Sequence, residues 1–252
     1  MSQTLEEFFK ENNKIALGFS GGTDSAFLLW NAVHYGADVG IYFAKSAFQP
    51  LFELEDARRL CRELGVQLRV LELDVLQDAD VVKNDEKRCY YCKNQIFGAL
   101  KRQALADGYH VIIDGTNASD DVNDRPGYQA LQEMEVRSPL RECKVTKADV
   151  RELSKEIGLF TAEKPSYACL ATRVWEHPLT TESLARAEKA EAMVAAKGFS
   201  DFRVRCQYEK AILQMNEDQY DKAVELLPEL QEALGQLFEK VVLDEAPRKL
   251  LM

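Results

Sequence analysis

The stretch Ile15-Ala16-Leu17-Gly18-Phe19-Ser20-Gly21-Gly22-Thr23-Asp24-Ser25 decides the fold of this chain. Its first three residues form a short apolar run that predicts a buried strand, and an apolar pattern typical of a helix follows over residues 26–33. The two adjacent glycines let the backbone turn tightly and approach a ligand closely. Asp24 and Ser25 stand where the helix would begin, and the N–H groups of a first helical turn attract anions. The strand, loop and helix therefore predict a phosphate site, and the alternative is a tight turn that binds nothing.

The glycine loop matches neither of two common phosphate-binding motifs. No Gly-Lys-Ser/Thr follows it, as in the Walker loop, and it lacks the Gly-x-Gly-x-x-Gly of dinucleotide-binding proteins. The run from Ser20 to Ser25 instead resembles the PP-loop of the ATP pyrophosphatase superfamily. That resemblance implies an enzyme that cleaves ATP between the α and β phosphates and adenylates a carbonyl or carboxyl oxygen. Ser20, Gly21, Gly22, Asp24 and Ser25 are then the expected ATP-binding residues.

Size and composition limit the kinds of protein this chain can be. Its 252 residues, 46% of them apolar, are enough for one large domain or for a domain with an appendage. The net charge of −10 disfavours a nucleic-acid partner, because phosphate backbones are bound mainly by lysine and arginine. No run of about 18 apolar residues is present, and residues 1–14 are too polar for a secretory signal. We therefore expect a cytoplasmic protein that binds neither nucleic acid nor a membrane.

Strand and helix patterns alternate through the first part of the chain. Short apolar runs are separated by apolar stripes of helical period, and a glycine follows each of the first two stripes. This βαβαβ order predicts a parallel, doubly wound α/β sheet with helices on both faces. Ligands of such sheets bind beyond the carboxyl ends of the strands, where the glycine loop lies. The expected strands cover residues 14–18, 39–43, 67–73, 110–114 and 137–140, and the expected helices cover 25–35, 51–64, 93–106 and 146–157.

The character of the chain changes near residues 170–180. An Ala/Glu/Lys-rich helix is expected over residues 180–197, followed by a hairpin, two helices and a strand at 240–243. This order predicts a smaller α+β domain. We expect a PP-loop domain over residues 1–172 and a small domain for substrate binding or oligomerisation over residues 173–252.

A carboxylate-rich loop follows the strand expected at residues 110–114. It begins with Asp114-Gly115-Thr116-Asn117 and continues through several acidic residues to Asp124. A solvated turn is the simplest reading, because Asp and Asn favour turns. Its position at a strand carboxyl end favours a role near Mg²⁺ and ATP, since Mg²⁺ takes one or two carboxylates together with phosphate oxygens. Gly115 and Asp124 are the nucleotide-site residues expected here, and Asp24 is the other candidate carboxylate.

The six cysteines include one pair with metal-like or redox-like spacing, Cys89-x-x-Cys92 at the start of a helix. A structural zinc would need four ligands, and no second pair is present. Cys169 as a third thiol would leave one coordination position open, which suits a [4Fe–4S] cluster with an exchangeable ligand on its fourth iron. Cys61 lies on an apolar helical stripe and is expected in the core. Cys143 and Cys206 have no assigned role.

Several motifs occur in order over residues 14–215. They are the PP-loop, Cys89-Tyr90-Tyr91-Cys92-Lys93, Asp114–Asn117 with Asp124-Arg125-Pro126-Gly127, Ala168-Cys169-Leu170-Ala171-Thr172-Arg173 and Phe202-Arg203-Val204-Arg205. Together these motifs resemble the LarE family, whose members are ATP-dependent sulfur transferases that make the nickel-pincer nucleotide cofactor of lactate racemase. The resemblance implies that ATP adenylates a carboxylate of pyridinium-3,5-biscarboxylate mononucleotide and that sulfur then replaces oxygen to give a thiocarboxylate.

The resemblance also implies a source of sulfur. Some family members sacrifice a cysteine at the position matching Cys169, whereas others carry the added Cys-x-x-Cys and are expected to hold a cluster that delivers an extra sulfide. This chain has all three thiols, so the cluster type is expected, with Cys89, Cys92 and Cys169 as both ligands and catalytic residues. Lys93 is expected to neutralise charge on the adenylate or the substrate. The sulfur donor, and whether turnover is catalytic or sacrificial, stay open.

Further roles follow from the same resemblance. Arg203 and Arg205 alternate on one expected strand face and match the residues that hold the mononucleotide phosphate; solvated surface arginines are the alternative. Glu191 matches a glutamate that can bind metal, although an exposed helix residue is the simpler reading. The expected partners are ATP, the nucleotide substrate, other nickel-pincer biosynthesis proteins and further copies of the chain. The competing functions are an iron–sulfur tRNA thiolase of the same superfamily and a non-catalytic ATP- or metal-binding scaffold.

Overall fold

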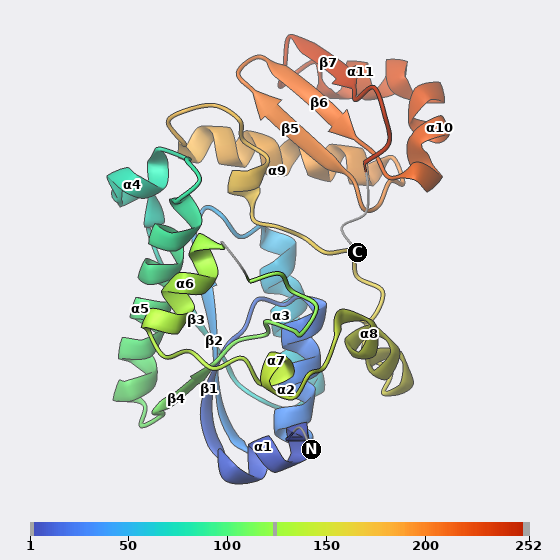
Figure 1. Cartoon of the computed structure of the whole chain (residues 1–252). Helices are drawn as coiled ribbons and strands as arrows, with labels where there is room; N and C mark the ends of the chain where they lie inside the picture. Colours follow the sequence, from blue (N-terminus) through green and yellow to red (C-terminus); the bar gives the residue numbers. More distant parts are fainter. Residues whose placement is uncertain (1–2, 123–124, 249–252) are drawn as a thin grey trace. The chain divides into compact units, whose positions relative to one another are not determined.

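A computed structural model describes residues 3–122 and 125–248 of the chain (Figure 1). Its contacts divide the chain into two compact units. The first unit comprises Met1–Val75 and Asp85–Lys164, and the second comprises Leu76–Asn84 and Pro165–Met252. The second unit therefore includes the short segment Leu76–Asn84 from the first half of the chain. It also begins at Pro165, several residues before the expected boundary at residue 172. The functional division of the chain at that boundary stays a prediction.

The first unit is built on a four-stranded parallel sheet with the order β3-β2-β1-β4. Its strands are β1 (Lys14–Gly18), β2 (Asp38–Lys45), β3 (Leu68–Glu72) and β4 (Val111–Ile113). The chain moves outward from β1 through β2 to β3 and then returns to the other side of β1 for β4. The loops after β1 and β4 thus flank the point where the strand order reverses, which is where open α/β sheets bind ligands. The predicted parallel α/β fold is confirmed.

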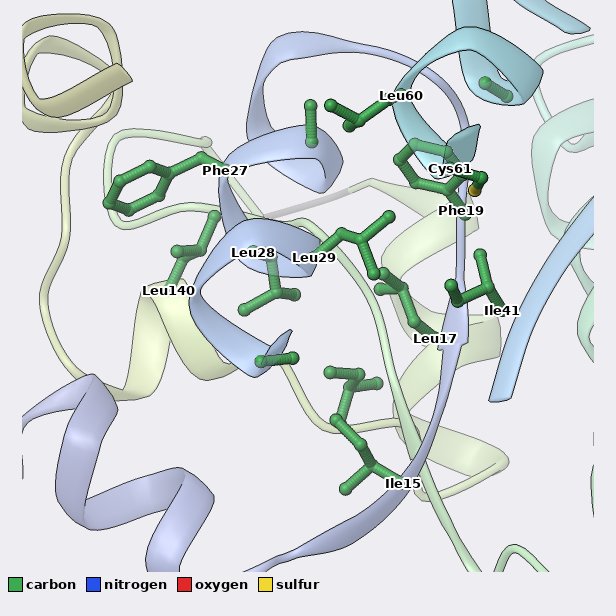
Figure 2. Close-up of a cluster of buried hydrophobic side chains, with 14 of the residues drawn as sticks. Ile15, Leu17, Phe19, Phe27, Leu28, Leu29, Ile41, Leu60, Cys61 and Leu140 are labelled. Carbon is green, nitrogen blue, oxygen red and sulfur yellow. The ribbon is translucent and has the colours of Figure 1, made fainter. Parts of the chain in front are cut away.

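Alternating side chains on the central strands build two separate cores. Ile15 and Leu17 of β1 face one side of the sheet, with Ile41 of β2 beside them (Figure 2). Ala16 and Tyr42 face the other side. The first core includes side chains from α1 (Leu5–Glu11), α2 (Thr23–His34) and α3 (Leu51–Glu63), and the second includes side chains from α5 (Arg88–Ala106) and α6 (Pro126–Glu133).

The sequence predicted helices correctly where a capping motif marks the start of the helix, but one expected strand is wrong. The α8 helix (Lys147–Glu156) begins with a capping box in which Thr146 and Asp149 satisfy each other's backbone N–H groups. The strand expected at residues 137–140 is wrong: only Arg137 forms a single bridge, to Ile113, and α7 (Pro139–Glu142) begins two residues later. Pro139 lacks the N–H that a strand ladder needs, and its fixed φ suits the first turn of a helix. The α1 helix, η1 (Val75–Gln77) and α4 (Ala79–Val82) lie in segments where no regular structure was expected.

The second unit has its own three-stranded sheet, with the order β5-β6-β7. The β5 strand (Arg203–Gln207) and β6 (Lys210–Gln214) form the predicted antiparallel hairpin, and β7 (Lys240–Leu243) pairs with β6 in parallel. The α9 helix (Thr181–Ala196) buries Leu184, Ala187, Ala190 and Val194. The remaining elements are η2 (Leu170–Thr172), α10 (Glu217–Glu225) and α11 (Leu227–Leu234).

Over the described residues, none of the helices combines the length and the apolar character needed to cross a membrane.

Candidate active site

The glycine loop between β1 and α2 is held in shape by its own hydroxyl groups. The Oγ atoms of Ser20 and Ser25 lie 3.0 Å apart, and the Ser25 hydroxyl donates to the carbonyl oxygen of Gly22 at 3.1 Å. Gly22 is the N-cap residue of α2, so the first N–H groups of that helix open onto the loop. The loop thus provides the N–H groups and the positive dipole end that a phosphate needs.

Gly21 tolerates no side chain, for two independent reasons. Its φ of +74° lies in the left-handed region that L-residues avoid. A Cβ atom there would also lie 2.6 Å from the backbone oxygen of Glu53 in α3. The loop therefore packs directly against the backbone of a neighbouring helix.

The loop after β4 approaches the same helix start. A Cβ on Gly115 would lie 3.0 Å from the backbone nitrogen of Ser25, so this glycine allows the two backbones to come together. Asp114 is buried and accepts hydrogen bonds from the hydroxyls of Thr116 at 2.5 Å and Ser138 at 2.7 Å, which fixes the loop. Asn117 donates to Oδ1 of Asp24 at 3.2 Å. The expected pairing of these two loops is therefore present, whereas Asp124 lies outside the described residues.

Two lysines that the sequence analysis did not identify reach the glycine loop. The Nζ of Lys147, at the start of α8, lies 2.6 Å from Oδ2 of Asp24. The Nζ of Lys164 donates to the carbonyl oxygen of Gly21 at 3.2 Å and lies 2.6 Å from Oδ2 of Asp56. The sequence predicts that Lys147 lies at the start of a capped helix. It does not predict which element that helix packs against, so the contact with Asp24 could not be foreseen. Positive charge is thus concentrated beside the expected phosphate site.

A pocket of about 460 Å³ opens at the carboxyl ends of β2 and β3. Its volume is within the usual range for small-ligand sites. One wall is the turn after β2, where the Nζ of Lys45 donates to the carbonyl oxygen of Gln49 at 2.5 Å and Ser46 bonds the Gln49 side chain at 2.8 Å. The pocket is lined by Lys45, Ser46, Ala47, Glu72, Leu73 and Asp74, none of which the sequence analysis singled out.

The six cysteines differ in burial, and burial raises the pKa of three of them. Burial raises the pKa of Cys61 and of Cys143 to about 11 each, and that of Cys206 to about 12. These thiols stay protonated at neutral pH, and the core position expected for Cys61 is confirmed, since it is 2% exposed. Of the three expected ligands, Cys89 is exposed, Cys169 is half-buried and Cys92 is buried.

The three expected ligand thiols are placed within their own units. Cys89 and Cys92 lie three residues apart in the first turn of α5, in the first unit, and therefore on one side of the helix. Arg88 donates to the Cys89 sulfur at 3.7 Å. Cys169 is the N-cap residue of η2 in the second unit. Among the residues that the structure describes, no group of three His, Cys, Asp or Glu side chains is gathered to hold a metal. Lys93 is half-buried, with its Nζ 5.0 Å from the centre of the Phe97 ring.

The segment around Cys169 is anchored by a buried arginine. Arg173 is fully buried, and its Nη1 donates to the carbonyl oxygen of Ala168 at 2.5 Å. Its Nε donates to Oε1 of Glu191 at 2.9 Å, while Oε2 of Glu191 accepts from the Tyr167 hydroxyl at 2.5 Å. Oε1 also accepts from the backbone N–H of Val204 in β5 at 3.0 Å. Glu191 is thus a buried structural acceptor here, and not the exposed helix residue that was the simpler reading.

Guanidinium groups outnumber carboxylates around Glu191. Arg203 and Arg205 extend from β5; Arg203 donates to the backbone oxygen of Ser166, and Arg205 to that of Thr172 at 2.6 Å. Burial, reinforced by the positive charges of Arg173 and Arg248, lowers the pKa of Arg203 to about 10. Burial likewise lowers the pKa of Arg205. The Nη2 of Arg173 is buried and has no hydrogen-bond partner within the described part of the chain. A cluster that holds this much positive charge is suited to an anion.

The fold and the loop geometry define the class of protein. A parallel sheet whose first strand runs through Ser-Gly-Gly-x-Asp-Ser into a helix is the PP-loop, adenine nucleotide α hydrolase-like fold. A tRNA-specific 2-thiouridylase of Fervidobacterium nodosum, a PP-loop protein, is 22% identical over 187 residues, which cover 60% of this chain and 54% of that protein. No family model matches the chain.

Other relatives match more than four-fifths of the chain. An uncharacterized protein of Synechocystis sp. is 32% identical over 227 residues, covering 88% of this chain and 84% of that protein. The pyridinium-3,5-bisthiocarboxylic acid mononucleotide synthase of Lactiplantibacillus plantarum is 31% identical over 217 residues, covering 85% and 79%. This chain therefore belongs to the LarE family of sulfur transferases.

A prediction follows for Gly21. We expect Gly21→Ala to reduce the free energy of unfolding by clearly more than Gly36→Ala. Both glycines have a φ of +74°, but nothing lies within 4 Å of a Cβ on Gly36. The left-handed conformation alone costs an alanine about 1–2 kcal/mol, and only Gly21 adds a clash with a backbone oxygen. Urea unfolding followed by circular dichroism measures both variants, and equal losses would contradict the expected packing.

A second prediction concerns Glu191. Glu191→Ala leaves the buried guanidinium of Arg173 without its carboxylate, so we expect a loss of about 3–5 kcal/mol in the stability of the second unit. Lys189→Ala on the same helix is exposed and should change stability by less than about 0.5 kcal/mol. Urea titration in the Trp30→Phe background, monitored by the fluorescence of Trp175 in the second unit, reports on both. Similar curves for the two variants would show that the ion pair is not structural.

Proposed function

We propose that this chain is an ATP-dependent sulfur transferase that forms AMP and pyrophosphate, and that it acts on a carboxylate of pyridinium-3,5-biscarboxylate mononucleotide. The observation that carries the proposal is the meeting of the glycine loop and the β4 loop at Asp24, in a chain related to a bisthiocarboxylic acid mononucleotide synthase. That relative's name describes two thiocarboxylates on a pyridinium mononucleotide. Its substrate therefore carries both a phosphate and reactive carboxylates.

The glycine loop and its neighbours supply what an adenylation needs. A carboxylate oxygen of the substrate attacks the α-phosphorus of ATP, the bond from that phosphorus to the bridging oxygen breaks, and pyrophosphate leaves. The N–H groups at the start of α2 and the ammonium of Lys147 can take up the charge that develops on the leaving pyrophosphate. A sulfur nucleophile then displaces AMP from the acyl carbon. The pocket beside Ser46 and Ala47 is the proposed place for the adenine ring.

Asp24 fits the role of a Mg²⁺ ligand. Its side chain is about one-quarter exposed, and a cationic ammonium, that of Lys147, already lies 2.6 Å from its Oδ2. Carboxylate oxygens are the ligands that Mg²⁺ prefers, together with phosphate oxygens. Mg²⁺ held there would neutralise charge on the pyrophosphate.

The cysteines at the start of α5 and in the Cys169 segment are the proposed ligands of a [4Fe–4S] cluster. Three thiols can serve as ligands of a [4Fe–4S] group: Cys89 is exposed, Cys169 is half-buried and Cys92 is 9% exposed. Burial holds the other three thiols protonated. Cys89, Cys92 and Cys169 would hold it, and such a cluster supplies a coordinated sulfide and one iron with an open position. Lys93, one residue after Cys92, is proposed to offset negative charge on the acyl adenylate.

The arginine cluster of the second unit is the proposed site of the substrate phosphate. Arg203 and Arg205 provide guanidinium groups with the geometry that suits phosphate, and Glu191 is already fully engaged by other donors. A phosphate would relieve the mutual repulsion of these arginines. This supports separate sites for ATP and for the nucleotide substrate within the same chain.

Asp24→Asn should lower pyrophosphate release by about a hundredfold or more, because it removes the charge proposed to hold Mg²⁺. The assay follows pyrophosphate from ATP with the biscarboxylate mononucleotide present. Glu63→Gln removes one exposed carboxylate elsewhere on the first unit and should leave the rate unchanged. Equal rates in the parent and Asp24→Asn would contradict the assignment. Release that requires tRNA would favour the tRNA thiolase, and the absence of pyrophosphate release with every substrate tried would favour a scaffold.

Anaerobic reconstitution should load the chain with iron and sulfide and give the visible absorption of a [4Fe–4S] cluster. Each of Cys89→Ala, Cys92→Ala and Cys169→Ala should lose that absorption, since three thiolates are the proposed ligands. Cys143→Ala is the matched control and should keep it. A triple variant that binds as much iron as the parent would refute the ligand assignment.

A further inference from the structure

One aromatic side chain beside the arginine cluster is unusually exposed. Trp175 is 45% exposed, while its neighbours Val174 and Glu176 are 1% and 8% exposed. Its backbone N–H donates to the carbonyl oxygen of Cys206 at 2.8 Å, and Val174 forms a parallel bridge with Cys206 at the edge of β5. The backbone is thus fixed on both sides, and the indole alone faces solvent.

Trp175 shares a face of the small sheet with Arg205. Successive residues of an extended strand point to opposite faces, and Val204 and Cys206 are fully buried. Arg205, between them, points to the other face, as does Trp175 in the adjoining bridge. The Arg205 Cζ lies 5.6 Å from the centre of the Trp175 ring.

The guanidinium beneath this exposed ring is held in position. The Nε of Arg205 donates to Gln214 at 2.7 Å, and its Nη1 donates to the backbone oxygen of Thr172 at 2.6 Å. Ile212 is the cross-strand neighbour of Arg205 and is half-buried on the same face. The face therefore offers an aromatic surface, a fixed cation and an aliphatic side chain next to one another.

This arrangement matches the two ends of a pyridinium mononucleotide. A guanidinium binds phosphate, and tryptophan is the side chain that attracts a cationic ring most strongly. We propose that Trp175 is the platform on which the cationic pyridinium ring of the substrate stacks while Arg203 and Arg205 hold its phosphate. The inference rests on the proposed function, because the arginine cluster is assigned to phosphate there. Trp175 is thereby a residue that selects charged rings over neutral ones.

Intrinsic fluorescence can observe this contact directly. The chain has two tryptophans, so Trp30→Phe, in the first unit, leaves Trp175 as the reporter. Nicotinamide mononucleotide serves as a pyridinium probe and ribose 5-phosphate as the ring-free control. The reduced form, whose dihydropyridine ring absorbs the tryptophan emission, is the neutral-ring control in calorimetry only, where we expect it to bind more weakly than the oxidised form. A stacked pyridinium accepts an electron from the excited indole and quenches it. We expect saturable quenching by nicotinamide mononucleotide, and competition by ribose 5-phosphate without static quenching of its own.

Calorimetry of variants separates stacking from phosphate binding. Trp175→Ala should weaken the binding of nicotinamide mononucleotide about tenfold, and Trp175→Phe should weaken it by less. The affinity for ribose 5-phosphate should change by less than about twofold in either variant. Tyr208→Ala removes an exposed aromatic side chain at the β5–β6 turn and should change neither ligand.

Four results would overturn the inference. Ribose 5-phosphate that binds as tightly as nicotinamide mononucleotide would refute stacking while leaving the phosphate site intact. Equal weakening of both ligands by Trp175→Ala would make Trp175 a support for the arginines only. Failure of both ligands to bind would refute the phosphate site and the inference together. A change of oligomeric state in Trp175→Ala, with ligand affinity unaltered, would assign the exposed indole to contact between copies of the chain.

Discussion

The backbone at Gly21 is the constraint on which the geometry of the glycine loop depends. Its left-handed conformation turns the chain from β1 into α2 within a few residues, and its missing side chain lets the turn lie against the backbone of α3. Without that turn the N–H groups at the start of α2 would not open toward the strand carboxyl ends. Gly115 makes the matching approach from β4, so the site is formed by two backbones that glycine allows to meet.

The chain is acidic overall, but its positive side chains are concentrated at two places. The net charge is −10, yet Lys147 and Lys164 lie at the glycine loop, and Arg173, Arg203 and Arg205 gather around a single buried glutamate. Such local excess is what small anions need, whereas a nucleic acid needs an extended basic surface. The two positive sites are consistent with the proposed reaction, in which ATP would occupy one and a mononucleotide the other.

Burial gives three of the six cysteines a raised pKa. Cys61, Cys143 and Cys206 have raised pKa values because apolar surroundings disfavour the thiolate. Cys89 and Cys92 begin a helix, and Cys169 caps a short 3₁₀ turn in a segment anchored by Arg173. The anchoring pair Arg173–Glu191 links this segment to β5 and thereby to Arg203 and Arg205. The segment of Cys169 and the arginine cluster proposed for the substrate phosphate are therefore held by the same buried ion pair.

The sequence by itself determined the elements and the order of the main sheet, because strand alternation, helical period, glycine turns and caps are local signals. It also indicated the glycine loop and its partner at Gly115, since parallel strands end at one edge. The sequence-based prediction failed at residues 137–140, where a strand was expected but Pro139 begins a helix. Only the tertiary structure decided that Lys147 and Lys164 reach the glycine loop, that Glu191 is buried against Arg173, and that Trp175 faces outward beside Arg205. These contacts join residues far apart in the chain, and their partners are fixed by packing between elements, which no local pattern encodes.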